Sequence, residues 1–303
     1  MKNKKLRVII SSDMHYSITS QEPRTVQSDY YSITNDARLQ FWVDSIKEEH
    51  VRCPIDLLLI AGDVSFDLCD KRGTVTNGLG STVDPFMQKY VAQLPKEIPI
   101  YVLPGNHDPY YDENWVKKTG FHRQGYVVLE DQLFIMLDTF PEGMEDEYDT
   151  VKGTPYINVN VDYVKEIMAQ YPTHKVWLVS HYFHCNAESE DFKALVRENK
   201  RVMGMFAGHS HQSHPIQLGE DYANKTVAQT GHFSYSFFMP FPTGNVEDEF
   251  NAFFGFRELV IDGDGAYSNY IVPDTKGLPL FLKDKVTPVD LRRREVHSVK
   301  YQF

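Results

Sequence analysis

The chain is poor in the features that mark secreted and membrane-spanning proteins. Only three of its 303 residues are cysteine, and none forms a C-x-x-C pair. That excludes a disulfide framework and a zinc ribbon. No run approaches the roughly 20 apolar residues of a membrane span, and the apolar part of the N-terminus is too short for a signal-peptide core. We therefore expect a cytoplasmic protein with reduced thiols.

Positive charge is also scarce. Asp and Glu together number 42, against 31 for Lys and Arg, so the formal net charge at pH 7 is −11. Such a balance disfavours non-specific binding to nucleic acid or to an anionic membrane. We expect a small-molecule partner, and the sequence leaves the oligomeric state open, a homo-oligomer included.

The composition is that of a folded protein. Hydrophobic residues make up 42% of the chain and aromatic residues 13%, which is enough to bury a substantial core. Short apolar runs alternate with helix-like segments, a pattern typical of an α/β fold. Continuous apolar runs indicate strands covered on both faces.

Ten strands and five helices are predicted from these patterns. Strands are expected at 6–10, 55–60, 98–103, 126–129, 133–137, 176–180, 202–207, 226–229, 258–261 and 267–272. Helices are expected at 36–49, 84–94, 112–119, 160–171 and 191–199. In the second helix, Asp84 is expected to be the N-cap and Pro85 the first helical residue.

Other segments have no clear period. Residues 17–34, 67–83 and 141–158 look irregular, as expected either of binding loops or of solvated insertions. The last stretch, 273–303, is expected either to wrap the surface or to pair as an edge strand.

Five short polar motifs follow predicted strands. They are Asp13-Met14-His15, Gly62-Asp63, Gly105-Asn106-His107-Asp108, His181 and Gly208-His209-Ser210-His211. Ligands of open α/β sheets gather at the carboxyl ends of the strands. We therefore expect these five loops to share one crevice.

The residue types in these motifs indicate metal ions. Carboxylates crowded into one crevice repel each other, and cations remove that conflict. Mixed Asp, Asn and His ligands suit Mn²⁺, Fe or Zn²⁺ better than calcium, which prefers oxygen alone. Seven such side chains exceed the needs of one tetrahedral site, so two metals with one shared ligand fit the number.

The order D-x-H, G-D, G-N-H-D, H and G-H-x-H resembles the calcineurin-like metallophosphoesterase superfamily. These motifs span Asp13 to His211, roughly two thirds of the chain. The resemblance implies an α/β fold, a four-layer αββα sandwich of two mixed sheets flanked by helices. It places a dinuclear metal site at the C-terminal ends of the strands. It also implies a single domain over 1–303, in which 212–303 completes the second sheet and adds a C-terminal extension.

The resemblance assigns the metal ligands residue by residue, for two divalent or trivalent transition-metal ions (Mn, Fe or Zn). The first ion would be bound by Asp13, His15 and His211. The second would be bound by Asn106, His181 and His209. Asp63 would bridge the two.

Two further residues are implied as catalytic. His107 matches the histidine that contacts the phosphate and is assigned as general acid. Asp108 follows it and would orient it. Asp67 is another candidate for that orienting role, and the sequence does not choose between the two.

The implied activity is hydrolysis of a phosphoester by a metal-bridging hydroxide. Phosphodiesters are favoured, because the arrangement resembles a class that includes bacterial phosphodiesterases. The alternatives are a phosphomonoesterase acting on a small-molecule phosphate and a non-catalytic metal-binding scaffold of the same fold.

The remaining histidines divide into two sets. We expect structural roles for His50, His122, His174 and His297. His184, His214 and His232 lie near motifs and could touch the site. The apolar run 232–241 that begins with the last of these is expected to be core, with a substrate wall or a dimer contact as the alternative.

Overall fold

The structure is a computed structural model. It describes residues 5–17, 26–66, 82–142, 155–234, 254–263, 265–276 and 292–303, with the backbone alone for 26–33.

Two six-stranded sheets are formed by the described residues. The first sheet has the order β12-β11-β10-β1-β2-β3. Its strands are β1 (Leu6–Ser11), β2 (Leu57–Ala61), β3 (Ile100–Leu103), β10 (Phe256–Asp262), β11 (Gly265–Val272) and β12 (Arg294–Gln302). The second has the order β4-β5-β6-β7-β9-β8. Its strands are β4 (Gly125–Leu129), β5 (Gln132–Leu137), β6 (Lys175–Ser180), β7 (Val202–Ala207), β8 (Pro215–Gln217) and β9 (Thr226–Gln229).

Both sheets are mixed. In the first, β1 pairs in parallel with β2 and antiparallel with β10. In the second, β5 pairs in parallel with β6 and antiparallel with β4.

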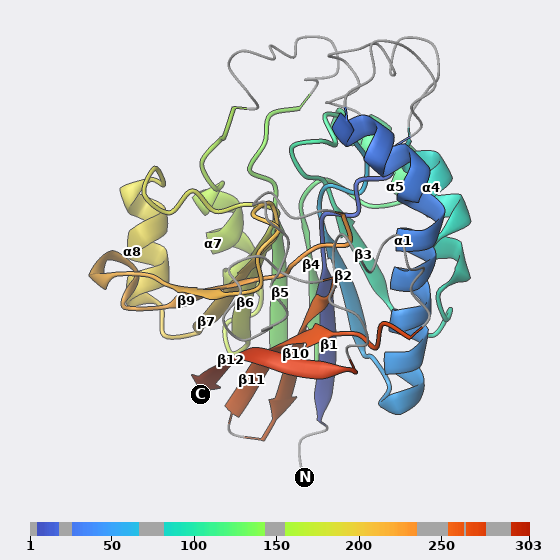
Figure 1. The fold of residues 1–303 in the computed structure, drawn as a ribbon. Helices are drawn as coiled ribbons and strands as arrows, with labels where there is room; N and C mark the ends of the chain where they lie inside the picture. Colours follow the sequence, from blue (N-terminus) through green and yellow to red (C-terminus); the bar gives the residue numbers. More distant parts are fainter. Residues whose placement is uncertain are drawn as a thin grey trace.

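Helices cover the outer face of each sheet (Figure 1). The helices α1 (Val26–Arg52), α4 (Val83–Lys89) and α5 (Asp112–Thr119) lie on the first sheet, and α7 (Val161–Gln170) and α8 (Glu190–Glu198) on the second. Short 3-10 turns occur at Val91–Gln93 and Glu220–Tyr222. This is the expected α/β fold, a four-layer αββα sandwich.

The burial of β1 shows why its sequence is apolar except at Arg7 and at the terminal Ser11. Ile9 packs in the cluster under α1, with Leu39 and Trp42. Val8 and Ile10 point the other way, into the layer between the sheets. Because both faces are covered, apolar side chains are favoured in the strand, and its one buried charge, Arg7, is paired with Glu49 and Glu258.

The layer between the sheets is large and aromatic. Trp177 and Phe134, from the second sheet, stack at 6.4 Å. They pack in one cluster with Leu57 and Leu59 of the first sheet. This layer fixes the two sheets against each other and brings their strand ends to a common edge.

The helix α1 is longer than predicted. It begins at Val26, so the expectation of an irregular segment over 17–34 is wrong for 26–34. Thr34 and Asn35 therefore lie inside the helix. The Asn35 side chain donates to Ser17 O, and Thr34 Oγ1 accepts from Arg38 Nε at 2.7 Å.

The helix α4 starts one residue before the predicted cap. Its N-cap is Thr82, whose side chain makes no capping bond. The Asp84 carboxylate instead accepts a hydrogen bond from Lys118 Nζ at 2.9 Å. An ion pair to α5 thus replaces the predicted cap.

The C-terminal strands divide between the sheets. Only β8 and β9 complete the second sheet, whereas β10, β11 and β12 extend the first. The expectation that 212–303 completes the second sheet is therefore wrong for the last three strands. The physical reason is that β10 pairs with β1 from Leu6↔Ile261 to Ile10↔Arg257. Of the two alternatives for 273–303, the edge strand is found, as β12 on β11.

Within the described part of the chain, no helix has both the length and the apolar character needed to cross a bilayer.

Candidate metal centre

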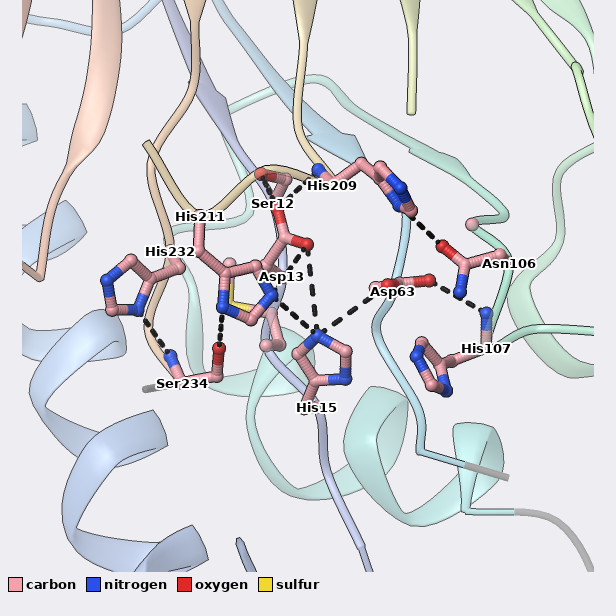
Figure 2. Close-up of polar contacts among 12 residues, drawn as sticks. Ser12, Asp13, His15, Asp63, Asn106, His107, His209, His211, His232 and Ser234 are labelled. Carbon is pink, nitrogen blue, oxygen red and sulfur yellow. Dashed lines mark hydrogen bonds and ion pairs between the residues drawn. The ribbon is translucent and has the colours of Figure 1, made fainter. Parts of the chain in front are cut away.

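All seven predicted ligands lie together at one edge of the two sheets, and Figure 2 shows most of them. Asp13 and His15 follow β1, Asp63 follows β2, and Asn106 follows β3. From the second sheet, His181 follows β6, and the loop after β7 carries the remaining pair, His209 and His211.

Backbone strain is concentrated in these residues. Five of the seven adopt a left-handed backbone, with φ of 56° at Asp13, 47° at His15, 51° at Asp63, 67° at His209 and 54° at His211. Residues other than glycine rarely adopt this region, and such strain gathers at functional sites where the surroundings enforce it.

Two glycines allow the loops to approach each other. Gly62 has φ of +87°, and a Cβ there would lie 2.6 Å from His181 Nδ1. A Cβ on Gly105 would overlap Asp63 Oδ1. At both positions a larger residue would displace a candidate ligand.

Three side chains form the first donor group. His15 Nε2 lies 3.1 Å from His211 Nε2. Asp13 Oδ1 lies 3.2 Å from His211 Nε2 and 3.8 Å from His15 Nε2. Donors that each bind one transition metal at about 2.0–2.1 Å are separated by roughly 3–3.5 Å. The three atoms are therefore spaced as ligands of one ion.

The Asp13 carboxylate points to the same conclusion. Its Oδ2 accepts from the backbone N–H of His209 at 3.0 Å and from Ser12 Oγ. Its Oδ1 is buried and has no hydrogen-bond partner among the described residues. An ionised oxygen in that position is costly unless a cation satisfies it, so the donor set fits a metal.

The second donor group centres on the amide oxygen of Asn106. Asn106 Oδ1 lies 2.8 Å from His209 Nδ1 and 3.1 Å from His181 Nε2. The other ring nitrogen of His181 faces the carbonyl of Ala61 at 2.8 Å. That contact holds Nδ1 as the protonated nitrogen and leaves Nε2 for a metal.

Asp63 reaches both groups with one oxygen. Its Oδ2 is 3.1 Å from His181 Nε2 and 3.6 Å from His15 Nε2. Its Oδ1 accepts the backbone N–H of His107 at 2.9 Å. This carboxylate therefore lies between the two donor groups.

The ring of His107 lies beside this shared residue. One of its nitrogens is within 4.8 Å of donor atoms of His15 and Asp63. Phe66 stacks on the imidazole, with ring centroids 5.0 Å apart and 22° between the planes. Sequence reasoning did not single out Phe66, because a lone aromatic residue in a loop carries no spacing signal.

Asp108 connects two of the ligand-bearing loops. Its carboxylate accepts from the backbone of Val64 at 3.2 Å, Ser65 at 3.0 Å and Gly105 at 2.8 Å. Burial raises the pKa of Asp108 to about 7, and the nearby Asp63 charge adds to this effect. These contacts hold the loops of Asp63 and Asn106 in register. Asp67, the other candidate for orienting His107, lies outside the described residues.

Comparison with known proteins identifies the family. The sequence profile of the calcineurin-like phosphoesterases matches residues 6–213. The chain belongs to this family. A search of curated proteins gave no match.

Solved structures share the calcineurin-like fold. A dimetal phosphatase from Danio rerio aligns with a TM-score of 0.59 and 11% identity, over 88% of this chain and 95% of the other. GAP50, the anchor in the inner membrane complex of Plasmodium, aligns with a TM-score of 0.50 and 13% identity, over 91% and 86%. At these identities the likeness concerns the fold alone. Family and fold together support metal-dependent hydrolysis of a phosphoester.

The charge states in this calcineurin-like site suit metal binding. Burial opposes ionisation of Asp13, yet the neighbouring His211 and His15 hold its pKa well below the usual value. Burial lowers the pKa of His15, and it lowers that of His209 to about 4. Metal ligands must be ionised carboxylates and neutral imidazoles, and the direction of each of these three shifts favours that state.

His181 differs from the other imidazoles. Burial disfavours its charged form, but the Asp63 carboxylate outweighs burial and raises the pKa of His181 to about 9. A metal at this group would have to displace the proton between them.

Of the three undecided histidines, His232 contacts a candidate ligand, and His184 lines the cavity beside the second donor group. Its ring stacks on His211, with centroids 5.2 Å apart and 21° between the planes. His214 instead stacks on His297 at 4.1 Å. Part of the apolar run that His232 begins is core, since His232 and Phe233 are both fully buried. Its residues 235–241 lie outside the described part of the chain.

A cavity of about 590 Å³ adjoins the second donor group. Tyr182 and Ser210 line it, and each is next in sequence to a candidate ligand. The Tyr182 ring lies 4.5 Å from that of His209, centroid to centroid. This calcineurin-like site thus has space for an organic group beside it.

Proposed function

We propose that this protein is a dinuclear metallophosphoesterase that hydrolyses small-molecule phosphoesters, with phosphodiesters preferred. The observation that carries the proposal is the pair of donor groups sharing Asp63, one of which contains the buried Asp13 Oδ1 without a hydrogen-bond partner. A phosphomonoesterase is the alternative within the same chemistry.

The proposed ligand sets follow the two groups. Asp13, His15 and His211 would hold the first ion, and Asn106, His181 and His209 would hold the second, with Asp63 as the shared ligand. Mixed nitrogen and oxygen donors favour Mn, Fe or Zn. A pair of such ions polarises phosphoryl oxygens and makes water a strong nucleophile at neutral pH.

We propose that His107 is the general acid that donates a proton from its imidazole to the leaving oxygen. Its backbone N–H is fixed by Asp63 Oδ1, and its ring is held by Phe66. In the protein without substrate, burial lowers the pKa of His107 to about 3. A phosphate anion beside the ring favours the protonated imidazole, so substrate itself would charge the acid that donates to its leaving group.

We propose that Asp108 serves the reaction through the backbone. Its four accepted hydrogen bonds hold the loops of Asp63 and of Asn106 and His107. Loss of this carboxylate would misplace a bridging ligand and the acid together.

The remaining features of the proposal concern the setting of the enzyme. The net charge of −11 and the adjoining cavity support a small molecule over nucleic acid as the substrate. We further propose a single domain over 1–303 and a cytoplasmic location, consistent with the free thiols of Cys53 and Cys185.

A non-catalytic scaffold is the second candidate, since the Plasmodium anchor has a similar fold. The test is to load the purified protein with Mn²⁺ and assay p-nitrophenyl phosphate and its bis-ester. The proposal expects two bound metals and faster hydrolysis of the bis-ester. Protein that carries two metals and hydrolyses neither ester would favour the scaffold.

A further inference from the structure

A short buried segment, residues 231–234, contacts the His211 ring at its Nδ1 atom and on its face (Figure 2). It follows β9, and its residues His232 and Ser234 are fully buried. The proposed reaction assigns this segment no role.

Ser234 lies between two imidazoles. Its Oγ is 3.3 Å from His211 Nδ1, and its backbone N–H donates to His232 Nδ1 at 3.1 Å. The ring of His232 in turn stacks on that of His211. The two rings and the hydroxyl form one packed unit.

The geometry of this unit suits one tautomer of His211. The Nε2 atom of His211 faces Asp13 Oδ1 at 3.2 Å and His15 Nε2 at 3.1 Å, so its lone pair is the one available to a metal. The proton of a neutral ring is then on Nδ1, where Ser234 Oγ can accept it. His232 Nδ1 accepts from the backbone, so it presents its own lone pair to Ser234 and fixes the position of that residue.

The same segment also holds the loop of Asp13. The backbone N–H of Phe233 donates to Asp13 O at 3.2 Å. The Arg38 guanidinium donates to the carbonyls of Phe233 at 2.6 Å and Met14 at 2.8 Å. Two members of the first donor group are thus supported from residues 231–234, whereas His181 of the second is held by Ala61.

We propose that Ser234, held in place by His232, is a positioning residue for the first metal. It fixes the orientation and tautomer of His211 and thereby sets the affinity of the group Asp13, His15 and His211. The second group does not depend on it. This inference rests on the proposed metal-binding function.

The test is a titration of metal-free, full-length protein with Co²⁺, followed by visible absorption and by competition with a chelator. Wild-type protein should bind two equivalents. Ser234→Ala should bind one equivalent with wild-type affinity and the other about 10–100-fold more weakly, as expected for loss of a partner behind a ligating histidine.

Ser213→Ala is the matched control. Ser213 is also buried and two residues from His211, but its hydroxyl faces His297 Nδ1 at 2.9 Å. This variant should bind both equivalents like wild type. Equal weakening in Ser213→Ala and Ser234→Ala would contradict the proposal.

A second pair of variants separates the role of the His232 acceptor from a general loss of folding. His232→Asn keeps an acceptor where Nδ1 stands, and His232→Leu removes it, so Asn should retain more affinity for the first metal than Leu. Equal affinities in these two would overturn the role of His232. Two equivalents bound by Ser234→Ala with wild-type affinity would overturn the inference alone, whereas a wild-type protein that binds no metal would overturn the proposed function with it.

Discussion

Asp63 is the residue on which both donor groups depend, because its Oδ2 lies near His15 and His181 at once. Asp63→Asn keeps the shape but removes the charge, so two cations would no longer be offset by a shared carboxylate. We expect fewer than two metal equivalents per chain by elemental analysis. Full occupancy in this variant would contradict the bridging role.

His107 is proposed to act as a general acid beside the metals, without binding them. His107→Ala should leave the metal content intact, because both donor groups remain complete. Turnover should fall by about 10²–10⁴, the usual contribution of a general acid, and most for esters with poor leaving groups. Equal losses for good and poor leaving groups would rule out proton donation by this ring.

The seven candidate ligands could be predicted because metal chemistry limits residue types and the motifs follow strands in a set order. Phe66 and Ser234 could not. A single aromatic residue or serine in a loop has many uses, and only the tertiary contacts show which imidazole it touches.

At the scale of elements, a buried ionic network joins four parts of the first sheet and its helix. Arg7 of β1 pairs with Glu49 of α1 and Glu258 of β10. Arg293, directly before β12, also pairs with Glu49 at 2.5 Å. The Glu49 side chain is only 5% exposed, so solvent screens these pairs little.

Glu49→Gln should therefore lower the free energy of unfolding. The loss should be about 3 kcal/mol, the lower end of the range for a broken buried pair, because Arg7 keeps Glu258. Urea unfolding followed by circular dichroism measures it.

Glu190→Gln is the control for this prediction. Glu190 pairs with Lys193 at 2.7 Å, but its side chain is 82% exposed. Its replacement should leave the unfolding midpoint nearly unchanged. Equal midpoint shifts in the two variants would contradict a special role for the buried network.

Element boundaries were predicted less well than element types. The strands β1, β2 and β3 follow from nearly continuous apolar runs, since both of their faces are covered. The start of α1 could not be predicted, because residues 26–34 show no clear apolar period in the sequence. The pairing of β12 likewise depends on contacts with β11, which lies about 30 residues earlier.

At the scale of the whole molecule, the candidate ligands connect the two sheets. Loops after β1, β2 and β3 carry Asp13, His15, Asp63 and Asn106, and loops after β6 and β7 carry the three other histidines. Bound metals would link the sheets and offset the strain of the left-handed ligand residues.

Removal of metal should therefore destabilise the protein as a whole. Ligands that bind only the folded state add about 2.7 kcal/mol at 100 times Kd. We expect the Tm to fall on treatment with a chelator and to recover with Mn²⁺ but not with Ca²⁺, which prefers oxygen donors. Calorimetry measures this, and an unchanged Tm would argue against resident metals.

The layer order of the molecule follows from the family resemblance, but the distribution of the last strands does not. Residues near the C-terminus return to β1, so the N-terminal strand becomes internal in its sheet. Such long-range pairing leaves no local mark in the sequence.

The most direct test of the dinuclear centre is a crystal structure of Mn²⁺-loaded protein, with anomalous scattering recorded at the manganese edge. We predict two peaks, one among Asp13, His15 and His211 and the other among Asn106, His181 and His209, with Asp63 in contact with both. A single peak, or peaks away from these seven side chains, would contradict the account.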